Sequence, residues 1–587
     1  PGSTKPAAPF PREADAVGAR HMVFEPDEYV VLREAMRQVF GTDRLPAIDL
    51  ANSRFVLSFS AEFLHNWIAP VQLGIGYGEF RHGPDRPRGV YYHVGPQLSA
   101  TASNADRWFP IVPGAEGLVA LAMAQAMVDE GLVDAGRASV IYGNLDQFTP
   151  ENVAPATGLS ADQIRELARS FGSEQPAVAI AGTSAAAHTN GLFNVAAVFA
   201  LNYLVGSVGV PGGLLLNPGS PDEANLPSVI GGAPYRDWEA LASDMTNGAV
   251  QLLLIHGANP VYGLPAASGF QGALGNVPTI ISFSTFMDET TAQADLILPD
   301  HTTLQSWGLH VPDPGPGFPF VSLQQPVVNP FVNSRAFGDV LISVASQLGE
   351  SLPWGSYEEA VRQLADGLRG TGGNIDANDS KEFFVTMQTQ GGWWDETATV
   401  TSAPSSPNGT ISPADPQFAG DPNDFPFYLL PYPTNGLDYG QFAHLPWLQA
   451  LPEPISTNVW TTWVEVNPVT GNDLGMATGD VVLVETPNGS FEVPVYINPA
   501  APRDVLLIPM GQGHQFYTRY AEKRGVNPFE IVAPQADSST GALAWAATRA
   551  RISTVGRKVR IPRFEGSVPA YQLEEFPIIQ VTGPSGA

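Results

Sequence analysis

The sequence predicts an α/β protein with two doubly wound, Rossmann-like lobes and a C-terminal β-barrel domain. Over residues 1–369, short apolar runs alternate with helix-like segments, which is typical of parallel sheets covered by helices. One strand–loop–helix–strand unit occupies residues 251–307. Beyond Phe427 the apolar residues alternate with period two instead, and this pattern indicates the strands of a small barrel.

Residues 1–175 are expected to form the first lobe. Its strands are predicted from unbroken apolar runs, and its helices from apolar residues at helical spacing that end at a glycine. Ser160 and Gln163 form a capping box for one of these helices. The expected helices cover residues 29–40, 118–128 and 161–171, and the expected strands cover 54–59 and 89–94.

Residues 176–369 are expected to form the second lobe, which opens with a strand at residues 177–181. The apolar run that follows, residues 192–210, is nearly long enough to cross a bilayer. Asn194, Asn202 and the Pro-Gly-Gly sequence after the run disfavour a membrane span. We therefore expect a helix that is buried inside the protein, where the same all-round apolarity is needed.

The unit at residues 251–307 predicts a ligand-binding edge. Residues 252–255 form an apolar run typical of a strand buried on both faces, and further strands are expected at 279–283 and 296–298. Small residues at 266–274 favour a helix between the first two strands. Ligands of such sheets bind at the carboxyl ends of the strands, so Asn259, Thr285 and Asp300 are candidate binding residues.

The rest of the chain divides into three parts. Residues 370–426 are rich in Gly, Asp, Ser, Thr, Asn and Pro, so we expect an irregular surface insertion with Trp393 and Trp394 as a local hydrophobic clasp. Residues 427–562 are expected to form the barrel, with a hairpin turn at Pro487-Asn488-Gly489. Residues 563–587 contain several prolines and predict an extended tail toward a partner domain.

Composition narrows the possible functions. The chain has 587 residues and a net charge of −29, which disfavours direct binding of nucleic acid. It contains no cysteine, so no cysteine-ligated iron–sulfur cluster is expected within these residues. A basic cluster near the C-terminus stands out in so acidic a chain and would serve either as a docking patch or as a solvated strand face; its members are Arg549, Arg551, Arg557, Lys558, Arg560 and Arg563.

The loop Gly257-Ala258-Asn259-Pro260 and the pattern from Thr291 to Pro299 resemble the molybdopterin-guanine-dinucleotide oxidoreductases, the dimethyl sulfoxide reductase family. Gly511-Gln512-Gly513-His514 and Gly525-Val526-Asn527-Pro528 resemble the late barrel motif that touches the pterin in that family. If a molybdopterin guanine dinucleotide with molybdenum is bound, the resemblance implies contacts from these loops and from the strand-end candidates: Gly257, Asn259, Pro260, Thr285, Asp300, Gln512, Gly513, His514 and Asn527.

The resemblance also implies a protein ligand for the metal, ahead of Phe40. No cysteine or serine lies between Pro11 and Leu50, which leaves Asp27 or Glu28 as possible oxygen ligands. Two solvated carboxylates at the start of a helix are the alternative interpretation, and the one we favour. His514 would either donate to a pterin or substrate oxygen, or satisfy a buried carbonyl. Arg335 and Asp300 are further polar candidates, with surface ion pairs as the alternative.

The segment from Leu57 to Val71 and the tail from Val568 to Leu573 resemble the large subunit of alternative complex III, a quinol-oxidising membrane assembly. That resemblance implies a scaffold on the periplasmic face, without a cofactor or catalytic residues of its own. Its partners would be an iron–sulfur (ferredoxin-like) domain or subunit, a multihaem cytochrome c subunit and integral membrane quinol-binding subunits. The alternative is an active molybdenum-bis-pterin subunit of the tetrathionate, thiosulfate or polysulfide reductase type.

Overall fold

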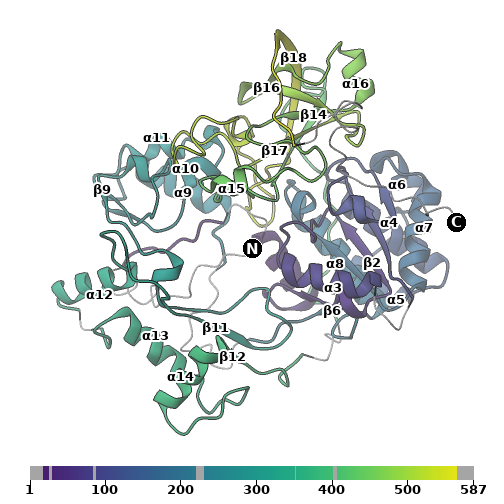
Figure 1. The fold of residues 1–587 in the computed structure, drawn as a ribbon. Coiled ribbons are helices and arrows are strands. Elements are labelled where there is room, and N and C mark those ends of the chain that lie inside the picture. Colours follow the sequence, from purple (N-terminus) through teal and green to yellow (C-terminus); the bar gives the residue numbers. More distant parts are fainter. Residues whose placement is uncertain are drawn as a thin grey trace, which may run out of the picture.

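In the computed structural model the first lobe and the second lobe lie on opposite sides, and the barrel domain lies above and between them in the view of Figure 1. The structure describes residues 18–25, 29–82, 87–219, 231–350, 352–400 and 406–564. Two α/β sheets, an antiparallel subdomain and a closed barrel make up the described parts. The predicted fold class is therefore confirmed.

The first lobe contains a parallel four-stranded sheet with helices packed against it. Strand β2 lies between β3 and β5, so that the strand order is β4-β3-β2-β5. The strands are β2 (Phe55–Phe59), β3 (Val90–Val94), β4 (Arg107–Phe109) and β5 (Ala177–Ala181). The helices are α2 (Tyr29–Phe40), α3 (Pro70–His82), α4 (Glu116–Asp129), α5 (Ala135–Tyr142), α6 (Pro150–Thr157), α7 (Ala161–Ser173) and α8 (Gly191–Val205).

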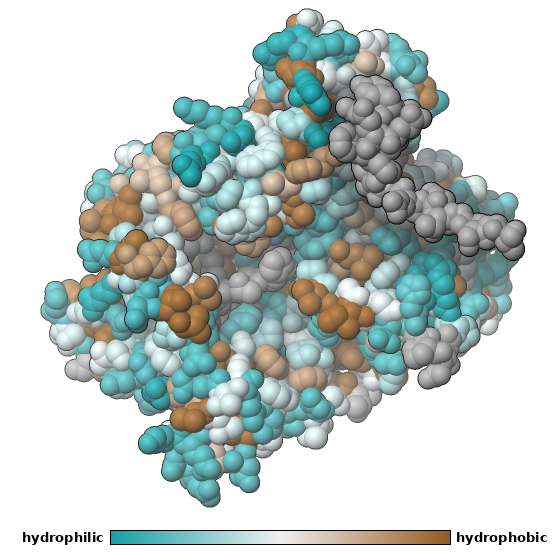
Figure 2. All heavy atoms as spheres, viewed as in Figure 1, coloured by the Kyte–Doolittle hydropathy of each residue, from teal (hydrophilic) through white to brown (hydrophobic). Residues whose placement is uncertain are grey.

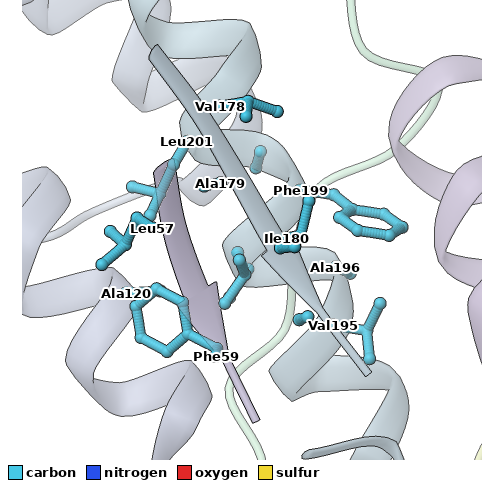
Figure 3. Packing of buried hydrophobic residues seen from close by; sticks show 14 of the residues in the cluster. Leu57, Phe59, Ala120, Val178, Ala179, Ile180, Val195, Ala196, Phe199 and Leu201 are labelled. Atoms are coloured by element: carbon cyan, nitrogen blue, oxygen red, sulfur yellow. The ribbon is translucent and has the colours of Figure 1, made fainter. Parts of the chain in front are cut away.

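Helix α8 is the buried helix that the apolar run predicted, and it lies against β2 and β5 (Figure 3). Val195 and Phe199 belong to the same apolar cluster as Ile180 of β5. The polar side chain of Asn202 bonds both the backbone N–H and the carbonyl of Ala179, at 2.8 Å each. Asn202 is thus satisfied without water, which explains how it is tolerated in an apolar helix.

The predicted boundary between the lobes at residues 175/176 is wrong. Strand β5 pairs with β2 in parallel register, Phe55 opposite Ala177, so it completes the first sheet instead of opening the second. Helix α8 also packs in the first lobe, against α2 and α4. After this helix, β6 (Leu214–Leu215) pairs antiparallel with β1 (Ala47–Ile48), which precedes β2. In the described residues no helix combines the length and apolarity needed to cross a bilayer.

The second lobe is a three-stranded parallel sheet in the order β7-β8-β9, with helices on one face. Its strands are β7 (Leu253–Ile255), β8 (Ile280–Ser282) and β9 (Leu296–Ile297), and its helices are α9 (Tyr235–Thr246), α10 (Pro260–Gly263) and α11 (Phe270–Leu274). Leu253, Ile255 and Ile280 face these helices. The prediction that residues 252–255 are buried on both faces is wrong, because Leu252 and Leu254 are 53% and 44% exposed.

An antiparallel subdomain follows, with its own apolar core. Strands β10 (Gly308–His310), β11 (Phe320–Gln324) and β12 (Gly392–Trp394) pair in that order, beside α12 (Phe337–Gln347), α13 (Tyr357–Asp366) and α14 (Ser380–Gln390). The expectation of an irregular insertion at 370–426 is therefore wrong for its first half, which supplies α14 and β12. Trp393 is buried in this core, as the clasp prediction required.

The barrel closes in the order β13-β17-β14-β16-β15-β18. Its strands are β13 (Phe427–Tyr432), β14 (Val464–Val466), β15 (Asp480–Thr486), β16 (Gly489–Ile497), β17 (Val505–Pro509) and β18 (Thr548–Lys558), with α15 (Pro446–Gln449) and α16 (Pro468–Asp473) between strands. The predicted hairpin joins β15 and β16, since Thr486 pairs with Gly489. Of the expected tail, residues 565–587 lie outside the described residues.

Candidate functional site

The predicted loops of the second lobe and the barrel meet at one buried carboxylate, Glu289. Asn259 Nδ2 donates to Glu289 Oε2 at 2.7 Å, and His514 Nδ1 lies 3.1 Å from both carboxylate oxygens. The backbone N–H groups of Gln515 and Phe516 also donate to Oε1, at 2.8 and 3.2 Å. Glu289 therefore joins the second lobe to the barrel domain. Its barrel partners, His514, Gln515 and Phe516, lie more than two hundred residues further along the chain.

His514 is fully enclosed, with 1% of its surface exposed. Its Nε2 lies 3.1 Å from the carbonyl oxygen of Gly440, and its ring stacks on Tyr262 with centroids 3.8 Å apart. A carboxylate and a carbonyl only accept hydrogen bonds, so both contacts are satisfied when His514 is an imidazolium. Of the two predicted roles, the structure therefore shows the histidine serving a buried carbonyl.

The charge arrangement around Glu289 favours its ionised form. Burial alone would raise the pKa of this carboxyl group, but the hydrogen bond and positive charge of His514, with the donors Asn259 and Phe516, lower the pKa to about 2. The neighbouring Asp288 behaves differently, because burial raises its pKa. The centre of this site is thus an ionised Glu289 carboxylate in hydrogen-bond contact with the His514 ring.

The other predicted barrel residues are also bonded within the protein. Tyr262 Oη donates to the carbonyl oxygen of Gln512 at 2.8 Å, and Asn527 Nδ2 donates to the carbonyl oxygen of Tyr262 at 2.8 Å. The Gln512 side chain donates to Gln449 at 2.8 Å. Gly513 has a φ of +90°, and a Cβ there would lie 2.2 Å from the backbone nitrogen of Asn527, so only glycine fits.

Some of the predicted strand-end residues of the second lobe are bonded within the protein, and others are exposed. Asp300 accepts from the backbone N–H groups of His301 and Phe337, and its Oδ2 lies 2.7 Å from His256 Nε2. Thr285 and Gly257 are exposed, whereas Pro260 begins α10 and is buried. Arg335 donates to the carbonyl oxygen of Asp339 and to Ser343 on α12. The structure thus brings Asn259 to the barrel loops but leaves Thr285 at the surface.

A second candidate edge lies in the first lobe, and the sequence analysis missed it. The strand order reverses between β2 and β5, and ligands of doubly wound sheets bind at such switch points. A narrow cavity opens there between the lobe and the barrel; it is lined by Ser60, Glu62, His93, Pro96, Gln97, Thr183, Ser184, Leu430, Pro431, Tyr432 and Trp545. The signal in the sequence was the polar segment Ser58–Glu62, which directly follows an apolar strand.

This cavity is acidic and closely packed. Burial raises the pKa of Glu62 to about 7, although Ser99 Oγ donates to it at 2.5 Å. Burial likewise raises the pKa of Glu116 to about 7, and Glu116 Oε2 has no hydrogen-bond partner. Burial lowers the pKa of His93 to about 3, so this ring is neutral. Among the described residues that line the cavity, none is a lysine or an arginine.

The proposed metal ligands cannot be placed in the structure. Asp27 and Glu28 lie outside the described residues. In the described part of the chain, no three His, Cys, Asp or Glu side chains are grouped so that they could hold a metal ion. The basic cluster on β18 is largely paired with acidic groups of neighbouring strands: Arg551 with Glu485, Arg557 with Glu492, and Lys558 with Asp480. These pairs match the solvated strand face rather than a free docking patch.

Two α/β sheets and a closed barrel define the architecture of this chain. Comparison with protein families identifies the family that has this architecture. The molybdopterin oxidoreductase family matches residues 34–346, and the molydopterin dinucleotide binding domain matches residues 453–548. The chain therefore belongs to the molybdopterin oxidoreductase family. The late barrel motif at Gly511–His514 and Asn527 lies inside the second match.

Individual relatives agree with this family. A Nitratidesulfovibrio vulgaris protein named "Menaquinone reductase, molybdopterin-binding-like subunit" is 28% identical over 85% of this chain and 70% of its own length. The thiosulfate reductase molybdopterin-containing subunit of Salmonella typhimurium is 22% identical over 80% and 69%. Among solved structures, acetylene hydratase from Pelobacter acetylenicus shares the fold, with a TM-score of 0.71 and 17% identity over 93% and 84% of the two chains.

The family implies a pterin dinucleotide, and the arrangement of side chains does not fit one as it stands. In the second lobe and barrel, the polar groups of Asn259, His514 and Asn527 are bonded to other protein groups. In the first lobe, Glu62 lines the cavity at the sheet edge, and Glu116 is buried behind it, bonded to the lining residue Ser60. Diphosphates are normally held by backbone N–H groups at helix N-termini or by cationic side chains, so buried carboxyl groups there oppose binding.

Proposed function

We propose that this chain is a cofactor-free, non-catalytic scaffold subunit of a quinol-oxidising electron-transfer complex of the alternative complex III type. The observation that carries the proposal is the closed hydrogen-bond network of Asn259, Glu289 and His514. In it, the groups that would face a pterin bond one another instead. Electron transfer would then proceed through cofactors of neighbouring subunits, since the redox chemistry belongs to the cofactors.

The relatives support a link to the quinone pool. The Nitratidesulfovibrio vulgaris protein is named as a molybdopterin-binding-like subunit of a menaquinone reductase. A subunit that resembles a molybdopterin enzyme within a quinone-linked complex is what the scaffold proposal requires. The proposed neighbours are an iron–sulfur domain or subunit, a multihaem cytochrome c and integral membrane quinol-binding subunits. The proposed location is the extracytoplasmic face of the membrane.

An active molybdenum-bis-pterin subunit of the thiosulfate, tetrathionate or polysulfide reductase type is the second candidate. The relative from Salmonella typhimurium favours it, because that protein is named as molybdopterin-containing. This function would require the Glu289–His514 ion pair to open, so that Asn259 and Gln512 could turn to a pterin. It would also require a metal ligand, for which Asp27 and Glu28 are the carboxylate candidates.

The metal and pterin content of the protein, purified from its native host with its associated subunits, tests the proposal. Molybdenum and tungsten would be measured by mass spectrometry, and pterin by the fluorescence of its oxidation product. A molybdoenzyme purified from the same cells is the positive control. We expect neither metal nor pterin in stoichiometric amounts. Near-stoichiometric molybdenum with pterin would refute the scaffold proposal.

A variant distinguishes the two functions independently of purification losses. In an active enzyme, replacing His514 with alanine would remove a pterin contact and lower the molybdenum content. In a scaffold, the same replacement leaves metal content at background and only loosens the contact between barrel and second lobe. A fall in bound molybdenum in His514→Ala would therefore favour the second candidate.

A further inference from the structure

Among the described residues, nothing buries one face of the sheet of the second lobe. Side chains alternate along β7, so Leu253 and Ile255 point to the helices while Leu252 and Leu254 point the other way. Leu254 lies opposite Ile281 of β8, and Ile281 lies opposite Leu296 of β9, which is 46% exposed. The three residues form an apolar row across all three strands, on the face opposite α9 and α11.

A second group of exposed apolar side chains follows the last strand. Between β9 and α12, the chain folds back on itself: Val327 and Val328 donate to the carbonyl oxygen of Leu304, and Arg335 donates to that of Pro299. The side chains in this doubled segment are also exposed: Leu304, Val327, Val328, Phe331 and Val332. We call the two parts together the open apolar face, defined by these five residues with Leu252, Leu254, Ile281 and Leu296.

The open apolar face is unusual for this molecule. Half of the exposed large apolar side chains of the described residues lie between Leu252 and Leu348. Hydrophobic atoms gather at the surface in the region of β9 (Figure 2). Parallel sheets occur almost only where both faces are covered, usually by helices, and large exposed apolar patches mark interaction sites. A cover for this face is therefore expected, and it would come from outside the second lobe.

The charges around the face indicate what kind of cover fits. Arg335 is the only lysine or arginine between Met245 and Glu350, and it is already bonded to α12. Two acidic residues of the same segment, Asp295 and Glu350, are exposed. The others are buried or bonded within the protein: Asp288, Glu289, Asp300, Asp313 and Asp339. A second copy of this chain, with a net charge of −29, would bring like charges together.

We infer that the open apolar face is the docking site for an amphipathic helix of a different protein chain, with an apolar stripe flanked by lysine or arginine. The helix would lie across β7, β8 and β9 and reach Phe331 at the end of the face. The basic flanks would meet the exposed carboxylates of Asp295 and Glu350. The inference rests on the proposed function only in that a scaffold must bind neighbours, and it holds equally for an active enzyme subunit.

Photo-cross-linking in the native host tests the inference. p-Benzoylphenylalanine would replace Phe331, which is 81% exposed, in the full-length protein, and a second strain would carry it in place of Trp447, which is 67% exposed on α15. Cross-linked peptides would be identified by mass spectrometry. We expect a product from position 331, absent from position 447, that contains a helical peptide of another protein with lysine or arginine beside its apolar residues.

Three outcomes would overturn the inference: a product with this same chain, a product with lipid, or no product above that of the Trp447 control. The double variant Leu254→Asp, Leu296→Asp supplies a second measurement. It should lower the cross-linking yield at position 331 at least tenfold, while the thermal unfolding of the isolated chain stays unchanged because both side chains are exposed. An unchanged yield in this variant would also overturn the inference. The metal content of the chain is independent of both results.

Discussion

Replacing Glu289 with alanine is expected to loosen the contact between the second lobe and the barrel domain. The carboxylate accepts hydrogen bonds from Asn259, His514 and two backbone N–H groups, and only 9% of its side chain is exposed. The replacement leaves the His514 imidazolium without its counter-charge in a buried place. Removing one partner of a buried ion pair costs about 3–5 kcal/mol.

The lowered pKa of Glu289 gives a similar free energy for this contact. A shift from the ordinary value of 4.5 to about 2 corresponds to about 3 kcal/mol of stabilisation when the group is ionised. Because the pKa of the folded state is the lower one, this stabilisation is complete above pH 4.5 and is lost as the pH falls toward 2. The wild-type contact should therefore weaken over that pH range, and the contact in Glu289→Ala should not change further.

Hydrogen–deuterium exchange of the backbone amides of Gln515 and Phe516 measures this contact directly. A loss of about 3 kcal/mol increases their exchange rate by roughly 10²-fold, since each 1.36 kcal/mol is a factor of ten. The matched control is Glu485→Ala, which removes an exposed pair with Arg551 and should leave these two amides unchanged. Equal protection of both amides in wild type and Glu289→Ala would refute the claim that Glu289 joins the two domains.

Three further changes test other parts of the structure. Glu62→Gln should reduce the pH dependence of first-lobe stability between pH 4.5 and 7 by about 3 kcal/mol, measured by urea unfolding, because burial raises the pKa of Glu62 to about 7 while the unfolded carboxyl group ionises near 4.5. Glu116 has the same raised pKa, so its share of the pH dependence should remain. Gly513→Ala should destabilise the barrel more than Gly475→Ala does in thermal unfolding, because both glycines have a positive φ but only the Cβ at 513 meets a neighbouring backbone. Trp393→Ala should cost about 3–5 kcal/mol in unfolding of the antiparallel subdomain, because the indole is buried in its core.

Local patterns predicted the elements of this fold well. The capping box of Ser160 and Gln163 marked the start of α7, and the turn at Asn488-Gly489 marked the hairpin of the barrel. These signals act over a few residues, so they can be read from the sequence alone. The neighbour of β5 could not be read in this way, because a buried apolar strand fits beside either sheet.

The candidate site was predicted only in part for the same reason. The family resemblance predicted that Asn259 and His514 belong to one site. The residue that joins them is Glu289, which lies 225 positions from His514 in the sequence. A lone acidic residue after a strand carries no sign of its partner. The exposure of Leu254 was also hidden, since an apolar run looks the same whether its cover comes from its own chain or from another.

Each of the two sheet edges of this protein holds a buried carboxyl group, and the two groups are stabilised in opposite ways. At the first edge, Glu62 is buried without a cation, and its pKa rises to about 7. At the second edge, His514 supplies the cation, and the pKa of Glu289 falls to about 2. A diphosphate would therefore meet partly ionised carboxyl groups at one edge and would have to separate an ion pair at the other. Both costs would oppose the binding of an anionic cofactor, which is the physical argument behind the proposed scaffold.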